Sequence, residues 1–141
     1  AFAYAAEQPE LDAAVVYYGT SPATDTLARV RAPVLGLYGG DDARVNATVP
    51  AAENELKRLG KRFEVETYAG AGHGFLRQQD GRAANKAAAE KAWPRTVEFL
   101  RRALATSTSA AGGASAAAFA PTASGDECGD ACAVPVDVAG R

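Results

Sequence analysis

Residues 33–42, PVLGLYGGDD, determine the fold class of this 141-residue chain. The apolar run Val34–Tyr38 has no polar interruption, which is typical of a strand that is buried on both faces of a sheet. A proline precedes the run, where no ladder hydrogen bond is needed, and two glycines and two aspartates follow it. We therefore predict a buried strand over Pro33–Gly39, with Asp41 and Asp42 in the loop at its carboxyl end.

Strand and helix signals alternate on both sides of this stretch. Ala13–Gly19 (AAVVYYG) is a continuous apolar run rich in β-branched and aromatic residues, and Phe63–Tyr68 (FEVETY) alternates like a strand nearer the sheet edge. Apolar residues at helical spacing predict a helix over Val49–Leu59. The Ala-rich stretch Ala1–Gln8 is interpreted as the end of another helix. Strands that alternate with helices predict an α/β fold with a mainly parallel sheet and flanking helices.

The last predicted helix begins near Ala84 and carries four large apolar residues at helical spacing. We expect its Trp93 side, which also includes Val97, Leu100 and Leu104, to pack against the core. Pro94 lacks a backbone N–H, so we expect it to start a new helix segment or to kink the helix.

The composition changes after Leu104. Residues 105–125 contain nine Ala, four Ser, three Thr and three Gly, with too few large apolar side chains to offset the entropy of ordering them. We predict a folded domain over residues 1–104 and a flexible, low-complexity tail over 105–141. Both cysteines, Cys128 and Cys132, fall in this tail. Their three-residue separation differs from the two residues of a thioredoxin or zinc-ribbon pair, so we assign them no metal or redox role.

Composition and charge exclude several classes of function. Fifteen Lys and Arg against seventeen Asp and Glu give a net charge of −2, without the basic surface of a nucleic-acid binder. No apolar run approaches the roughly 20 residues that span a bilayer. The chain has no Met and no basic leader, so we expect it to be the C-terminal part of a longer protein. We expect a cytoplasmic location, with export as the alternative if a signal lies upstream.

The candidate catalytic residues follow the predicted strands. In parallel α/β sheets, functional residues lie on loops just past the carboxyl ends of the strands. Asp41 and Asp42 follow one strand, and His73, the only histidine, follows the next in the glycine-rich loop GAGHGF (70–75). A carboxylate that orients an imidazole forms the acid–base part of a nucleophilic triad, and the acid precedes the histidine in α/β-hydrolases.

These stretches resemble the dienelactone hydrolases (carboxymethylenebutenolidases), a branch of the α/β-hydrolase fold, over essentially all of residues 1–104. The marks are AAVVYYG, APVLGLYGGDDARV with the pattern G-x-x-D-x-x-V, YAGAGHGFLR and AWPRTVEFL. The resemblance implies that Asp42 is the catalytic acid and His73 the catalytic base, while Asp41 belongs to the turn. It also implies that Arg77, four residues after the histidine, binds the carboxylate of the substrate.

The nucleophile of that family, a Cys or Ser in a G-x-C/S-x-G-G elbow, has no counterpart in this sequence. The resemblance implies that the elbow lies upstream, together with a glutamate partner and a second substrate arginine. Ser21 lacks the strand–turn–helix setting of an elbow, and Cys128 and Cys132 follow the histidine instead of preceding it. We expect the chain alone to be inactive. In the intact protein we expect hydrolysis of small esters or enol-lactones, with an anionic substrate, no cofactor and no metal.

Two other functions remain open from the sequence alone: a broader serine esterase or prolyl-peptidase-like hydrolase, and a non-catalytic α/β-hydrolase scaffold. Asp42 has an alternative interpretation as a helix-start acid, and Arg77 as an ordinary surface cation. Tyr18 and Ser21 are candidates to line the pocket. The oligomeric state is left open.

Overall fold

The computed structural model describes residues 1–112, with side chains as far as Thr106. At its centre is a three-stranded sheet in the order β1-β2-β3, and both pairs of neighbouring strands are parallel. The strands are β1 (Ala14–Tyr17), β2 (Val34–Gly39) and β3 (Phe63–Tyr68). Each lies within the range predicted from the sequence, so the α/β fold with a parallel sheet is confirmed.

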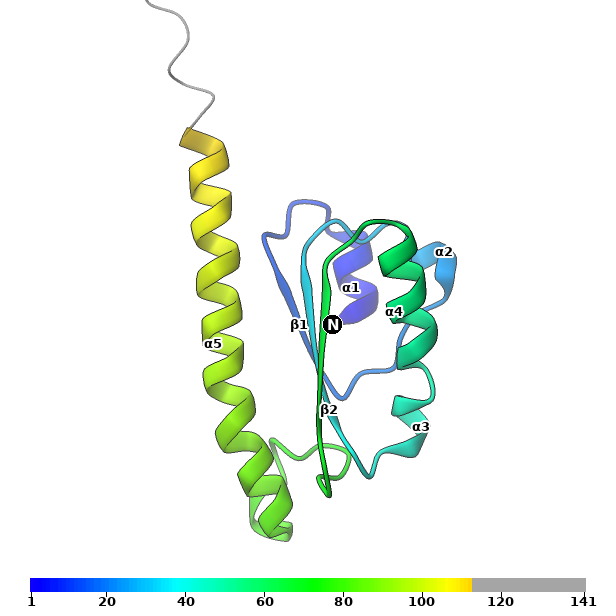
Figure 1. Ribbon diagram of the computed structural model, residues 1–141, viewed down its shortest axis with the longest axis vertical. Coiled ribbons are helices and arrows are strands. Elements are labelled where there is room, and N and C mark those ends of the chain that lie inside the picture. The colour runs from blue at the N-terminus through cyan, green and yellow to red at the C-terminus, as the bar shows by residue number, and fades with distance from the viewer. Residues whose placement is uncertain (113–141) are drawn as a thin grey trace, which may run out of the picture.

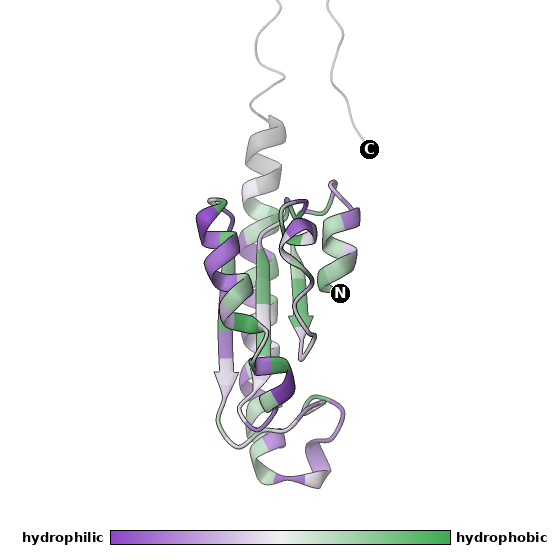
Figure 2. Ribbon diagram, turned by 90° about the vertical axis from the view of Figure 1, so that its right-hand side faces the viewer, coloured by the Kyte–Doolittle hydropathy of each residue, from purple (hydrophilic) through white to green (hydrophobic). Residues whose placement is uncertain are grey.

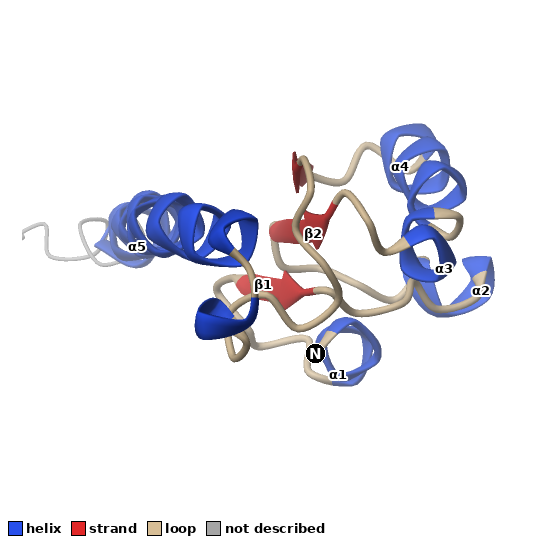
Figure 3. Ribbon diagram, turned by 90° about the horizontal axis from the view of Figure 1, so that it is seen from below, coloured by secondary structure: helices blue, strands red, loops and turns tan. Residues whose placement is uncertain are grey.

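Helices cover both faces of the sheet (Figures 1 and 3). One face carries four helices, and the other carries a single long helix preceded by a short 3-10 helix, η1. The first group is α1 (Phe2–Glu7), α2 (Thr24–Leu27), α3 (Ala43–Asn46) and α4 (Val49–Arg58); the others are η1 (Gln79–Gly81) and α5 (Ala83–Gly112). Parallel strands need crossover connections, which α2 provides between β1 and β2, and α3 with α4 between β2 and β3. The helices together bury the sheet.

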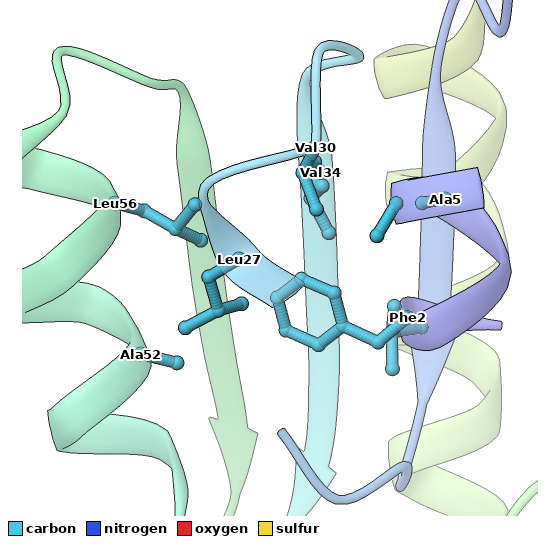
Figure 4. Packing of buried hydrophobic residues seen from close by; sticks show 9 residues of the cluster. Phe2, Ala5, Leu27, Val30, Val34, Ala52 and Leu56 are labelled. Atoms are coloured by element: carbon cyan, nitrogen blue, oxygen red, sulfur yellow. The ribbon is translucent and has the colours of Figure 1, made fainter. Parts of the chain in front are cut away.

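The core on the first face is built from α1, α2 and α4. Phe2, Leu27 and Leu56, one from each helix, converge on Val34 of β2 (Figure 4). The Phe2 ring also packs on Phe63 of β3, with the ring centroids 5.3 Å apart. This core fixes the amino-terminal half of the sheet.

The core on the second face lies between the sheet and α5. Leu35 and Leu37 of β2 point to this face and meet Phe75, Phe99 and a row of alanines on α5. Figure 2 shows apolar residues along β1 and β2, whereas polar residues interrupt β3. Glu64 of β3 is held on this face by Arg95 and Arg102 from α5.

The prediction that Trp93 and Leu104 pack against the core is wrong. Trp93 is 61% exposed and Leu104 50% exposed, whereas Phe99 and Ala103 are buried. Apart from Phe99, the buried stripe of α5 is made mostly of small residues, and the hydroxyl of Tyr17 lies 2.6 Å from Oγ1 of Thr96 within it. Small side chains bring the helix close to the sheet, and Trp93 and Leu104 lie outside the contact.

Helix α5 also differs from the prediction in its length. It runs through Pro94 without a new helix starting there, and it continues to Gly112, past Ala105 where the tail was predicted to begin. Residues 113–141 lie outside the described part of the chain, and so do the candidate cysteines, Cys128 and Cys132. Within the described part, no helix has the length and hydrophobicity to cross a membrane.

Candidate active site

The carboxyl ends of β2 and β3 bring the predicted acid and histidine together. Asp42 follows β2 and His73 follows β3, and these two strands are parallel neighbours in the sheet. Oδ2 of Asp42 lies 2.6 Å from Nδ1 of His73. The distance is that of a charge-assisted hydrogen bond.

Asp42 is held by its own backbone as well as by burial. It is the N-cap residue of α3, and its Oδ1 accepts a hydrogen bond from the Val45 N–H at 3.4 Å. Its side chain is only 6% exposed. One carboxylate oxygen of Asp42 therefore caps α3 while the other contacts His73. The two interpretations of Asp42 from the sequence, a helix-start acid and a partner of the histidine, are thus compatible.

Two glycines allow the acid loop and the histidine loop to touch. A Cβ on Gly39 would lie 2.5 Å from the Ala71 carbonyl oxygen, a distance that no real Cβ adopts. At this junction the Gly40 N–H donates to Tyr68 at 2.8 Å, and the Asp41 N–H donates to Ala71 at 2.9 Å. Gly39 is therefore required for the backbone contact between the two loops that carry Asp42 and His73, and a Cβ on Gly40 would be tight, 3.1 Å from Ala69 Cα.

His73 presents one ring nitrogen to the acid and the other edge to solvent. Its side chain is 49% exposed even though Nδ1 contacts a buried carboxylate. A carboxylate at Nδ1 favours the proton on that nitrogen in the neutral imidazole, which leaves Nε2 free to accept a proton. This arrangement is suited to general-base chemistry.

Aromatic rings form the wall and the floor beside the imidazole. The Tyr18 ring, just past β1, meets the His73 ring edge-on, with centroids 5.3 Å apart. Phe75 is fully buried and contacts Tyr17, Tyr18 and Tyr68 at centroid distances of 5.5–6.1 Å. The sequence left Tyr18 as an undecided candidate and gave no role to Phe75. The sequence features that could have indicated these two residues are the YYG stretch at the end of the first strand, for Tyr18, and the aromatic residue two positions after His73, for Phe75.

Two tyrosines of this cluster, Tyr17 and Tyr68, stay protonated at neutral pH. Burial raises the pKa of Tyr17, partly opposed by its hydrogen bond with Thr96. Burial also raises the pKa of Tyr68, and its hydrogen bond to the Glu66 carboxylate raises it further. Neither phenol can therefore act as the base in place of His73.

Arg77 lies on the exposed side of the same loop. Its backbone N–H donates to Gly74 at 2.9 Å, and its Nη2 atom lies 3.9 Å from the place where a Cβ on Gly74 would be. Among the described residues, its guanidinium has no hydrogen-bond or ion-pair partner. Within the described part of the chain, the loop thus carries an unpaired guanidinium four residues after the histidine. Asp41 pairs with Arg82 at 3.0 Å.

The remaining candidates are not brought to the histidine. The backbone N–H of Ser21 donates to Oγ1 of Thr48, and the buried Ser21 hydroxyl has no hydrogen-bond partner among the described residues. Within residues 1–112 no group of three or more His, Cys, Asp or Glu side chains could hold a metal ion.

Comparisons with known proteins show which family this chain resembles. A family model described as "Dienelactone hydrolase family" matches residues 1–104. A protein of Saccharolobus solfataricus named "Putative carboxymethylenebutenolidase" is 40% identical over 103 residues, covering 72% of this chain and 39% of the relative. A protein of Escherichia coli K12 with the same name is 35% identical over 111 residues, covering 70% and 40%. The chain spans about 40% of the length of these curated relatives.

A solved structure is also similar. The crystal structure of a "Putative Dienelactone Hydrolase" from Klebsiella pneumoniae matches with a TM-score of 0.60 and 34% identity, covering 69% of this chain and 45% of that one. The parallel sheet with helices on both faces, the matched family model and these relatives confirm the α/β-hydrolase fold that the motifs predicted. The chain belongs to the dienelactone hydrolase family.

Proposed function

We propose that this chain supplies the acid, the base and a substrate-binding cation of a hydrolase that cleaves a small ester or enol-lactone. One observation supports this most directly: Nδ1 of the half-exposed His73 lies 2.6 Å from the buried Asp42 carboxylate. An imidazole oriented in this way has a free Nε2 at the surface, where a nucleophile and a substrate can reach it.

In the proposed reaction, Nε2 of His73 takes the proton from a Cys thiol or Ser hydroxyl. That nucleophile belongs to an elbow that this sequence does not contain. The sulfur or oxygen forms a bond to the carbonyl carbon, and the bond to the leaving oxygen breaks as that oxygen takes the proton from His73. His73 then takes a proton from water, the resulting hydroxide attacks the acyl carbon, and the acid product leaves as the nucleophile regains its proton.

Asp42 and Arg77 have different roles in this proposal. Asp42 holds the imidazole in the Nδ1-protonated form and stabilises its cation when Nε2 is protonated. Arg77 forms a charge-assisted pair with a carboxylate on the substrate. Its guanidinium lacks a partner among the described residues, which favours an anionic substrate over the neutral esters of a broader serine esterase.

The test uses a protein that we call the assembled hydrolase: residues 1–141 joined to the upstream part of the Saccharolobus relative, where the family pattern places the elbow. We expect it to hydrolyse a carboxylate-bearing enol-lactone, and we expect the His73→Ala variant to lose this activity while its circular dichroism spectrum is unchanged. Arg82→Ala, which removes an exposed ion pair beside the loop, is the matched control and should retain activity.

Two results would contradict the proposal. Turnover that persists in His73→Ala would show that another group acts as the base. A folded assembled hydrolase that cleaves neither the lactone nor a neutral p-nitrophenyl ester would favour a non-catalytic scaffold.

A further inference from the structure

Asn85 occupies a position in the first turn of α5 that neither the motifs nor the proposed reaction uses. Asn85 is only 2% exposed, so its side-chain amide is buried away from water. Its Oδ1 accepts a hydrogen bond from the Gly72 N–H at 2.9 Å, and its Nδ2 donates to the Gln78 carbonyl at 2.9 Å. Gly72 immediately precedes His73, and Gln78 immediately follows Arg77. One buried side chain therefore bonds both ends of the segment that carries the proposed base and the proposed cation.

The segment between these two bonds has few other attachments to the rest of the fold. The backbone bonds to the acid loop stop at Ala71, and within the segment the Arg77 and Gln78 N–H groups bond back to Gly74. Gly74 itself has a φ of 75°, so the chain turns sharply just after the histidine. The buried Phe75 ring anchors the middle of the segment, and Asn85 fixes its ends.

Only an amide satisfies both groups. It offers an acceptor to the Gly72 N–H and a donor to the Gln78 carbonyl, whereas a carboxylate would oppose one oxygen with another. An alkyl side chain would leave a buried N–H and a buried C=O without partners. The ion pair between Arg82 and Asp41 at the same junction is exposed on both sides, so water can replace it.

We propose that Asn85 is a positioning residue that holds His73 against Asp42 and sets the spacing between His73 and Arg77. This inference depends on the proposed function for its catalytic meaning, but its geometry can be tested without turnover. The competing explanation is that Asn85 only stabilises the start of α5. That explanation predicts a less stable protein in which the His73 imidazole is unchanged.

The experiment uses ¹⁵N-labelled 141-residue chain and long-range ¹H–¹⁵N spectra. His73 is the only histidine, so its ring signals need no assignment by mutation. In the wild type we expect the Nδ1-protonated form to dominate. Asn85→Ala, which loses both loop bonds, should give a mixture of tautomers, and Asn85→Asp, which keeps an acceptor for Gly72, should fall between the two.

Thr96→Val is the matched control. It removes the hydrogen bond between Tyr17 and Thr96 from the same helix and touches no bond of the loop, so the His73 spectrum should stay as in the wild type. Folded Asn85→Ala with a wild-type His73 spectrum would overturn the proposal. So would a change of equal size in Thr96→Val, because general loosening of α5 would then explain both.

A measurement on the wild-type chain covers the case in which both Asn85 variants fail to fold. The Gly72 amide should exchange with solvent about tenfold or more slowly than an unprotected amide, because Asn85 buries and bonds it. Exchange at the unprotected rate would contradict the positioning role. A failure of the assembled hydrolase to turn over would leave these results untouched, so the two proposals fail separately.

Discussion

The Tyr18 ring meets the His73 imidazole edge-on, with ring centroids 5.3 Å apart and planes at 63°. Tyr18 reaches this position with a φ of 40°, in the left-handed region that residues with a Cβ rarely adopt. Its N–H still donates to the Leu37 carbonyl at 2.9 Å, so β2 holds the strained residue in place. The carboxyl end of β1 thus contributes a strained aromatic residue beside a proposed catalytic group, where such strain is often found.

The Tyr18 contact leads to a prediction about the ring and its hydroxyl. Tyr18→Ala in the assembled hydrolase should lower kcat by up to about tenfold, because an aromatic pair of this kind contributes about 0.5–1.5 kcal/mol. Tyr18→Phe should retain activity, since the ring contact remains. Steady-state kinetics on a neutral ester measures both. An equal loss in the two variants would mean that the hydroxyl matters and not the ring.

Asp42→Asn should leave the fold intact and reduce kcat of the assembled hydrolase by several orders of magnitude. The asparagine oxygen can still cap α3, but the imidazole loses its orienting charge; about 10⁴-fold is the loss measured for the same change in a serine protease. Asp41→Asn is the neighbouring control and should be nearly silent, because among the described residues Asp41 forms an ion pair only with the exposed Arg82. The reverse outcome would show that the acid is Asp41.

Arg77→Ala should raise KM about tenfold for substrates that carry a carboxylate and leave kcat nearly unchanged. The expected size is that of one charge-assisted hydrogen bond, about 1.5 kcal/mol at an exposed site. A neutral p-nitrophenyl ester should be hydrolysed as before. Equal damage to the neutral and the anionic substrate would make Arg77 a structural residue and remove the argument for an anionic substrate.

The ion pairs between β3 and α5 make stability depend on pH. Burial opposes ionisation of Glu64, but hydrogen bonds from Arg95 and Arg62 outweigh it and lower the pKa of this carboxyl in the folded chain. A lowered pKa contributes stability above the unfolded value, which is lost as the pH falls through the folded value.

Glu64→Gln should therefore lower the Tm of the 141-residue chain at pH 7 by a few degrees, about 1 kcal/mol. At pH 3 the difference from the wild type should shrink, because the wild-type carboxyl is then losing its charge as well. Glu98→Gln is the control, since Glu98 is exposed on α5 and forms no ion pair among the described residues. A difference that grows towards acid pH would contradict the lowered pKa.

Much of the fold could be predicted because burial dictates the strands. The apolar β2 sequence and the alternating β3 sequence indicated their elements with bounds close to those observed. The helical face of α5 could not be predicted from residue size. Its alanines pack closely on the sheet, so Trp93 falls outside the contact. Such a preference for small residues arises from the distance between two layers, which one segment of sequence does not reveal.

The candidate site was predictable only where a motif marked it. Asp42 and His73 follow neighbouring parallel strands, and parallel pairing brings the carboxyl ends of such strands to one edge. Asn85 had no such mark, because its importance depends on two backbone groups of a loop that turns back over α5. The left-handed backbone conformation of Tyr18 could not be predicted either, since nothing in the sequence YYG requires a positive φ.

The last prediction concerns Gly39, which lies where the acid loop and the histidine loop meet. A Cβ on Gly39 would lie 2.5 Å from the Ala71 carbonyl oxygen and 2.6 Å from that of Gly72, and both are backbone atoms that cannot rotate away. Gly39→Ala must therefore push the histidine loop from β2, which should destabilise the chain by about 1–3 kcal/mol, the usual cost of overpacking. The push also moves His73 away from Asp42, so the Nδ1–H signal of the imidazole should weaken. Gly81→Ala is the control, because a Cβ there meets nothing within 4 Å. If Gly39→Ala melted like the wild type and kept that signal, the two loops would not be in the contact on which the whole site depends.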